Sequence, residues 1–171
     1  MESKNLWAPW RIDYVQGLSD DEPCDCFICH YLDRPDEDDR NMVLWRSEHG
    51  IVLLNRYPYN NGHLMIAPVR HISDIDDANE AELLGLIKLV REAKKALTLV
   101  LKPHGFNIGI NLGRCAGAGL PGHVHIHIVP RWDGDTSFMS VCGDTDVISQ
   151  SMKELLDQLR KVSIEHNLPG L

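Results

Sequence analysis

Three histidines alternate with apolar residues from His123 to Val129, and this pattern constrains the fold and chemistry of the chain more than any other. Successive side chains of an extended strand point to opposite faces, so we expect His123, His125 and His127 on one face. The first and third histidine would then lie roughly 13 Å apart. The interleaved Val and Ile side chains would fill a core on the other face. Such a row of imidazoles is typical of nucleophilic catalysis, acid–base catalysis or metal binding.

A purely structural role for the three histidines is the weaker interpretation. Each imidazole has two polar nitrogens, which require partners when they are buried. A single histidine in a strand is usually a satisfied core residue or a surface residue. Three at strict period two favour a functional site.

The size of the chain fits one domain that buries its own core, at 171 residues. Because there is no run of 18 apolar residues, we expect no membrane-spanning helix and no membrane partner. The first five residues are not followed by an apolar stretch, which argues against a secretory signal. We therefore expect a cytoplasmic protein.

The net charge of −8 bears on the class of ligand. Binding to duplex nucleic acid requires clustered Lys and Arg, so we expect no such partner. Small nucleotides remain candidates because backbone N–H groups and a few side chains can hold them.

Apolar patterning predicts an α+β architecture with an antiparallel sheet of about five strands, a long central helix and a C-terminal helix. We expect strands at 42–46, 51–55, 63–67, 106–111 and 123–129, and helices at 77–102 and 147–162. Helices so few cannot cross over between parallel strands, so we expect a meander with helices on one side.

The long helix should begin at a cap formed by Asp76 or Asp77. Its apolar residues at three- and four-residue spacing predict one buried stripe, made of Leu83, Leu86, Ile87, Val90, Leu97 and Val100.

A glycine-rich loop from Asn111 to Gly122 leads directly into the histidine row. Its four glycines let backbone N–H groups approach an anion closely. Most loops of this composition are simple turns. Next to three histidines, this loop favours phosphate binding.

Cys26 and Cys29 form a C-x-x-C pair, a spacing that is frequent in zinc sites. Cys24 is a nearby thiol that competes with Cys26 for such a role. The first alternative is a redox-active pair, but it requires a βαβ context that the sequence does not predict. The second is that the spacing of the two cysteines is coincidental. Thiols stay reduced in the cytosol, so metal binding is favoured over a disulfide.

The stretch His123–Val129 resembles the H-φ-H-φ-H-φ-φ signature of the histidine triad (HIT) superfamily of nucleotide hydrolases and transferases. Further stretches are similar to the branch of diadenosine tetraphosphate phosphorylases, at 6–11, 55–64, 105–113 and 130–135. The resemblance runs from about Leu6 to the end. It implies the HIT-like fold, as a homodimer whose sheets join.

The resemblance also implies that residues 1–171 form a single HIT domain. We expect an N-terminal arm at 1–23, a core with the triad at 24–132, and a C-terminal extension with a helix at 133–171.

The resemblance makes His125 the nucleophile that attacks the α-phosphorus of a nucleotide. His127 would lie beside the phosphate and donate to a non-bridging or leaving oxygen. His123 is the third catalytic candidate. A neutral imidazole can attack only if its other ring nitrogen holds the proton against an acceptor, such as a backbone carbonyl.

Nucleotide-binding roles follow from the same resemblance. Asn55 matches a position that binds the ribose hydroxyls, and a turn-forming role is its alternative. Asn111, Gly117 and Gly119 match the phosphate-binding segment. Relatives commonly have Ser or Thr where this chain has Gly119, which leaves open whether phosphate or water is the acceptor.

In zinc-bearing HIT proteins, the positions of His71 and His123 complete a Cys₂His₂ site with the pair Cys26 and Cys29. Four protein ligands leave no open position for substrate, so this zinc would be structural. It would tie the N-terminal arm to the sheet and fix His123.

We therefore expect an enzyme that acts on a purine nucleotide or dinucleoside polyphosphate through a nucleotidyl–histidine intermediate. A nucleoside phosphoramidate hydrolase of the same superfamily is the first alternative. Two further alternatives are a protein that binds nucleotides without turnover and a small interaction module held together by zinc.

Overall fold

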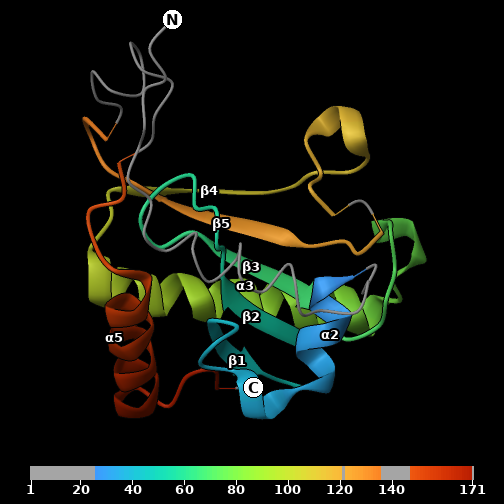
Figure 1. Ribbon diagram of the computed structural model, residues 1–171, viewed down its shortest axis with the longest axis horizontal. Coiled ribbons are helices and arrows are strands. Elements are labelled where there is room, and N and C mark those ends of the chain that lie inside the picture. The colour runs from blue at the N-terminus through green and yellow to red at the C-terminus, as the bar shows by residue number, and fades with distance from the viewer. Residues whose placement is uncertain (1–25, 121, 136–146, 171) are drawn as a thin grey trace, which may run out of the picture.

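The computed structural model describes residues 26–120, 122–135 and 147–170. Within them, five strands form one antiparallel sheet in the order β1-β2-β3-β5-β4 (Figure 1). The strands are Val43–Arg46 (β1), Gly50–Leu54 (β2), Leu64–Pro68 (β3), Gly105–Ile110 (β4) and Ile126–Arg131 (β5). The helices are Phe27–Asp33 (α2), Glu80–Leu101 (α3) and Met152–Glu165 (α5), with 3₁₀ turns at Pro35–Glu37, Ile75–Asp77 and Arg114–Ala116. This confirms the expected α+β fold; the N-terminal arm and Cys24 lie outside the described residues.

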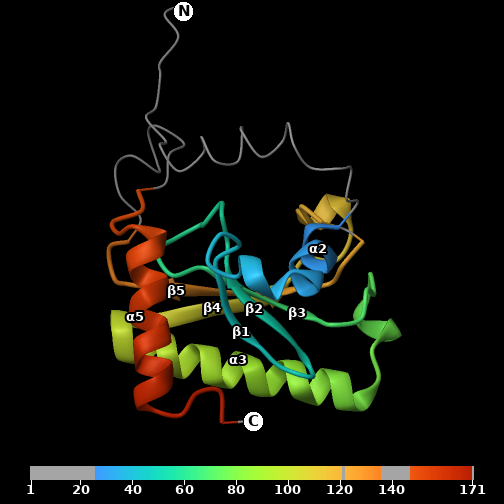
Figure 2. The same cartoon turned by 60° about the horizontal axis from the view of Figure 1, so that its bottom comes forward.

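Helices cover both faces of the sheet, where we had expected them on one side. Helices α3 and α5 lie against one face, and the short helix α2 lies against the other (Figure 2). The strands explain this arrangement because they are apolar on both sides. Val52 and Ile66 pack towards α3 and α5, whereas Ile51 and Met65 pack towards α2.

The start of α3 lies three residues beyond the expected position. Asn79 caps it: its side chain accepts the N–H of Glu82, and the Glu82 carboxylate accepts the N–H of Asn79, both at 2.9 Å. This reciprocal capping box satisfies two backbone donors of the first turn. Asp76 and Asp77, the expected caps, lie within the preceding 3₁₀ turn, which Asp74 caps. The Arg70 guanidinium joins this start to the end of β3 through Glu82, at 2.8 Å.

The buried stripe of α3 differs in part from the expected one. Leu86, Val90 and Leu97 are buried as expected, but Leu83 and Ile87 are 39% and 61% exposed. The helix buries a neighbouring stripe in their place. This stripe consists of Gly85, Leu89, Ala93 and Ala96. Small side chains let the helix approach the sheet closely.

The strand that carries the histidines begins later than expected, at Ile126. Only His127 therefore lies within the ladder, and His123 and His125 precede it. The segment before the strand is still held, because the Val124 N–H donates to the Ile72 carbonyl at 2.7 Å. Helix α5 also begins later than expected, at Met152, and packs three leucines into the core shared with α3.

Among the residues that the structure describes, strand β4 is the last strand of the sheet and pairs on one side only, with β5. Its residues 107–110 are exposed. Within the described residues, no helix combines the length and apolar character that a membrane crossing requires.

Candidate active site and metal centre

The histidine row lies on the sheet face that α2 covers. His127 is paired with Met65 on β3 and with Gly109 on β4. Met65 belongs to the cluster under α2, whereas Ile126 and Ile128 belong to the core under α3 and α5. The expected division into one imidazole face and one core face is confirmed for this strand. Because Gly109 has no side chain, the place beside His127 on β4 stays open.

One hydrogen bond determines the tautomer of His125. Its Nδ1 lies 2.9 Å from the backbone carbonyl oxygen of His123. A carbonyl can only accept, so Nδ1 carries the proton and Nε2 keeps its lone pair. This is the form of imidazole that can attack an electrophilic phosphorus.

A second chain of hydrogen bonds determines the tautomer of His127. The backbone N–H of Tyr59 donates to His63 Nδ1 at 3.1 Å, so the proton of this neutral ring is on Nε2. His63 Nε2 then donates to His127 Nδ1 at 2.9 Å. His127 therefore holds its own proton on Nε2. Its ring meets that of His125 edge to face, with 4.8 Å between centroids.

Burial favours the neutral forms of these imidazoles. It lowers the pKa of His63 to about 3, with a smaller contribution from repulsion by His127 and His125. Burial and the proximity of His125 lower the pKa of His127 to about 4. The pKa of His123 is also lowered, chiefly by burial. At neutral pH His63 and His127 are thus neutral, and His127 presents the proton of its Nε2.

His63 is a site residue that the sequence does not reveal, and it is fully buried beside the triad. The only signal was a histidine directly before an apolar strand. Its partner His127 is 64 residues further along the chain, so no local spacing reveals the contact.

Asn55, the expected ribose ligand, lies at the end of β2 next to His63. Its side-chain oxygen accepts the N–H of Tyr57 at 2.9 Å. Its amide nitrogen lies 3.4 and 3.5 Å from the two nitrogens of the His63 ring, so the amide sits over the ring. Asn55 thus borders the same polar surface as the triad.

Asn111 leaves the sheet beside His125. It follows Ile110, whose partner Ile126 comes directly after His125. In the loop beyond it, Gly113 and Gly117 have φ values of 78° and 87°, which explains the need for glycine at both places.

Gly117 and Gly119 occupy different environments in this loop. The Gly117 N–H donates to the Arg114 carbonyl at 3.0 Å, so it closes the 3₁₀ turn. At Gly119, φ lies outside the left-handed region and no atom lies within 4 Å of an added Cβ. A side chain at 119 is therefore sterically acceptable.

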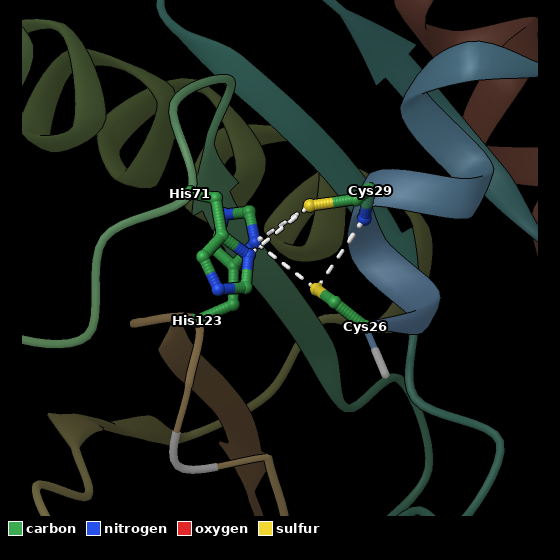
Figure 3. Close-up of side chains that lie close together, drawn as sticks. All are labelled: Cys26, Cys29, His71 and His123. Atoms are coloured by element: carbon green, nitrogen blue, oxygen red, sulfur yellow. Dashed lines mark hydrogen bonds between the residues drawn. The ribbon is translucent and has the colours of Figure 1, made fainter. Parts of the chain in front are cut away.

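The four expected metal ligands come together from three places in the fold (Figure 3). Cys26 caps α2 and Cys29 lies on its first turn, while His71 follows β3 and His123 precedes β5. Their ligand atoms all lie within 4.8 Å of one another. His123 Nδ1 lies 3.3 Å from Cys26 Sγ and 3.6 Å from Cys29 Sγ, and His71 Nδ1 lies 3.2 Å from Cys29 Sγ.

These distances fit a tetrahedral zinc ion. With Zn–S near 2.3 Å and Zn–N near 2.0–2.1 Å, sulfur and nitrogen ligands should stand about 3.6 Å apart. His123 Nε2 donates to the Pro68 carbonyl at 3.0 Å, which leaves the Nδ1 lone pair for the metal. A ligating histidine usually donates its other N–H to such an acceptor. Both nitrogens of His123 are thus engaged, Nδ1 at the thiols and Nε2 at the Pro68 carbonyl.

Comparisons with known proteins agree with this geometry. A family model described as HIT domain matches residues 37–134, more than half of the chain. An AP-4-A phosphorylase of Mycobacterium tuberculosis is 35% identical over 159 residues, covering 88% of this chain and 80% of that protein. The asymmetrical bis(5'-nucleosyl)-tetraphosphatase of Schizosaccharomyces pombe is 33% identical over 97 residues, or 57% of this chain and 53% of that protein.

Solved structures share the fold. A hypothetical histidine triad nucleotide-binding protein of Sulfolobus tokodaii superimposes with a TM-score of 0.66 at 28% identity, covering 82% of this chain and 93% of that one. A zinc-bound histidine triad family protein of Mycobacterium smegmatis gives a TM-score of 0.66 at 24% identity, over 82% of this chain and 96% of that one.

Proposed function

This chain belongs to the histidine triad family, and we propose that it cleaves dinucleoside polyphosphates through a nucleotidyl–histidine intermediate on His125. One observation supports this most directly. The tautomers that the backbone imposes leave a lone pair on His125 Nε2 and a proton on His127 Nε2. A site that only bound nucleotides would not require this pairing of nucleophile and donor.

In the first step, His125 Nε2 attacks the α-phosphorus, and a P–N bond forms as the P–O bond to the leaving nucleotide breaks. His127 gives its Nε2 proton to the departing oxygen or stabilises the developing charge on it. In the second step, water or inorganic phosphate attacks the same phosphorus. The P–N bond breaks, and His127 recovers a proton from the attacking group. One difficult displacement is thereby split into two easier ones.

The remaining predicted ligands surround this reaction centre. We assign Asn55 to the ribose hydroxyls, and Asn111 with the backbone at Gly117 and Gly119 to the phosphates. Gly117 acts mainly by shaping the loop, because its N–H is used within it. Charge stabilisation by such groups is the main requirement of phosphoryl transfer.

A structural zinc ion belongs to the same proposal. The fit of Cys26, Cys29, His71 and His123 to a tetrahedral site supports it. We assign the side chain of His123 to this metal and not to proton transfer. When bound, zinc would join α2 to the two segments that flank the sheet. Protein prepared without chelator should contain about one zinc per chain by elemental analysis.

The substrate is best tested with diadenosine tetraphosphate, with and without inorganic phosphate. The AP-4-A phosphorylase relative supports this choice. ADP and ATP formed only with phosphate would identify a phosphorylase, whereas AMP and ATP without it would identify a hydrolase. Turnover of an adenosine phosphoramidate alone would favour the phosphoramidate hydrolase.

The covalent step has its own test. Substrate labelled at the α-phosphorus should transfer the label to the protein, in a linkage that is labile to acid and stable to alkali, as expected for a phosphoramidate. Binding without label transfer and without products would instead favour a nucleotide-binding protein.

A further inference from the structure

We propose that the metal centre positions the nucleophile, through the backbone of His123. This inference rests on the proposed function for its catalytic consequence. The geometric link stands on the contacts alone: the side chain of His123 points into the metal cluster, and its carbonyl oxygen accepts the Nδ1 proton of His125. A single residue is shared by the two sites.

The acceptor carbonyl lies where the sheet no longer holds the chain. The β5 ladder begins at Ile126, so neither His123 nor His125 has a ladder partner. The bond from Val124 N–H to the Ile72 carbonyl, 2.7 Å long, takes over this task. A longer bond, 3.4 Å, joins the His123 N–H to the Leu120 carbonyl.

Two of the metal ligands lie next to the Val124–Ile72 bond, one on each of the two segments that it joins. His71 precedes Ile72, and His123 precedes Val124, so a metal ion would clamp the two segments next to their bond. The Pro68 carbonyl holds the other nitrogen of the His123 ring, at 3.0 Å. With the metal bound, two sets of contacts hold the backbone at His123: those of its own side chain and the hydrogen bond of the neighbouring Val124 N–H. Without the metal, the ring keeps its contacts with the Pro68 carbonyl and the two thiols. The peptide that carries the acceptor carbonyl then depends on the Val124 bond, so we expect this carbonyl to move more than in the metal-bound protein.

The consequence is specific to one imidazole. When its acceptor moves, His125 exchanges between tautomers, and a proton on Nε2 removes the lone pair that attacks phosphorus. The pair His63 and His127 should be unaffected, because the Tyr59 backbone fixes it at the opposite end of the row. We expect loss of the metal to lower kcat by about ten- to hundredfold, the usual effect of an outer-shell partner. The affinity for AMP should change by less than about threefold.

Imidazole ¹⁵N–¹H correlation spectra test the link without reference to activity. Wild-type protein is stripped of metal by chelation and titrated with Co²⁺, whose thiolate absorption reports occupancy. The fraction of His125 held as the Nδ1–H tautomer should rise in proportion to bound Co²⁺, while His63 and His127 keep one tautomer throughout. If His125 stays fixed in the stripped protein, the proposal fails. If all three imidazoles lose their fixed tautomers together, the metal supports the whole fold and the proposal also fails.

Two variants at His71 give a matched comparison, because this side chain reaches His125 only through the cluster. H71A should lose the metal and the fixed His125 tautomer, and H71C, which offers a third thiolate beside His123, should retain both. A metal-free H71A protein with a fixed His125 would overturn the inference. Failure of the zinc-loaded protein to turn over any nucleotide would instead overturn the proposed function, since the spectra do not depend on turnover.

Discussion

At the scale of single residues, the covalent step depends on His125. We predict that His125→Ala lowers the turnover rate by at least ~10³, because the variant lacks the unprotonated Nε2 that we assign to the attack on phosphorus. Nucleotide affinity should stay within about tenfold, since the phosphate contacts of the loop remain. Steady-state rates and calorimetric binding of AMP check both parts. Substantial turnover in a folded, uncontaminated variant would rule out His125 as the nucleophile.

Gly119 is the residue at which the choice of acceptor can be tested. Gly119→Ser adds a hydroxyl where the backbone and the surrounding space tolerate it. A hydrogen bond to bound phosphate contributes about 0.5–1.5 kcal/mol, so phosphorolysis should gain a few-fold over hydrolysis. Gly117→Ser is the matched control, because its φ of 87° makes any side chain strained there. An unchanged ADP-to-AMP ratio in Gly119→Ser would show that position 119 does not select the acceptor.

At the scale of elements, the contact of α3 with the β1–β2 turn requires Gly85. A Cβ at this position would come within 2.3 Å of the His49 side chain. We predict that Gly85→Ala lowers the free energy of unfolding by about 1–2 kcal/mol, since overpacking outweighs the better helix propensity of alanine. Adding His49→Gly, which also removes the His49 Cβ that would lie 2.5 Å from the new methyl group, should restore stability to the Gly85→Ala protein. Chemical denaturation of the two single variants and the double variant measures this; additive losses would contradict the contact.

Sequence alone predicted most strands and the main chemical groups, for different physical reasons. Alternating apolar residues report a strand directly, and the C-x-x-C spacing brings two thiols onto one helical turn. Helix α2 was missed because seven residues give too little periodicity. The exposure of Ile87 was missed because two overlapping stripes on α3 satisfy the same spacing. The role of His63 depends on a distant partner, which no local pattern contains.

At the scale of the whole molecule, the buried imidazoles link stability to pH. The pKa values of His63 and His127 are about 3 and 4 in the folded protein, against about 6.5 when unfolded. Between pH 4 and 6.5 the unfolded chain therefore binds more protons, so stability falls as pH falls through this range and is level above it. We predict that His63→Gln reduces this slope by up to about 1.4 kcal/mol per pH unit at constant metal content. Equal slopes in both proteins would contradict a neutral His63.

The expected homodimer, in which two sheets would join, can be tested at β4, whose outer edge has no partner strand within the described part of the chain. Ile108 on this strand is 46% exposed, and an unpaired apolar edge readily accepts another strand. We predict that Ile108→Asp shifts the sedimentation equilibrium towards monomer by at least tenfold in dissociation constant. The control is Ile164→Asp, because Ile164 lies on α5 and is 84% exposed. This variant should leave the dissociation constant unchanged. Identical association of both variants would place any interface elsewhere.

The neutral imidazoles described above have one more consequence, for how the site attracts its substrate. His63 and His127 carry no charge near neutral pH, and burial also keeps His123 from gaining one. Under the proposed function, these imidazoles would therefore meet a polyphosphate as oriented dipoles rather than as fixed positive charges. Dipoles are poorly screened by dissolved ions at short range. Capture of the substrate at this face should accordingly depend little on ionic strength, and discrimination between nucleotides should follow from shape more than from the number of their negative charges.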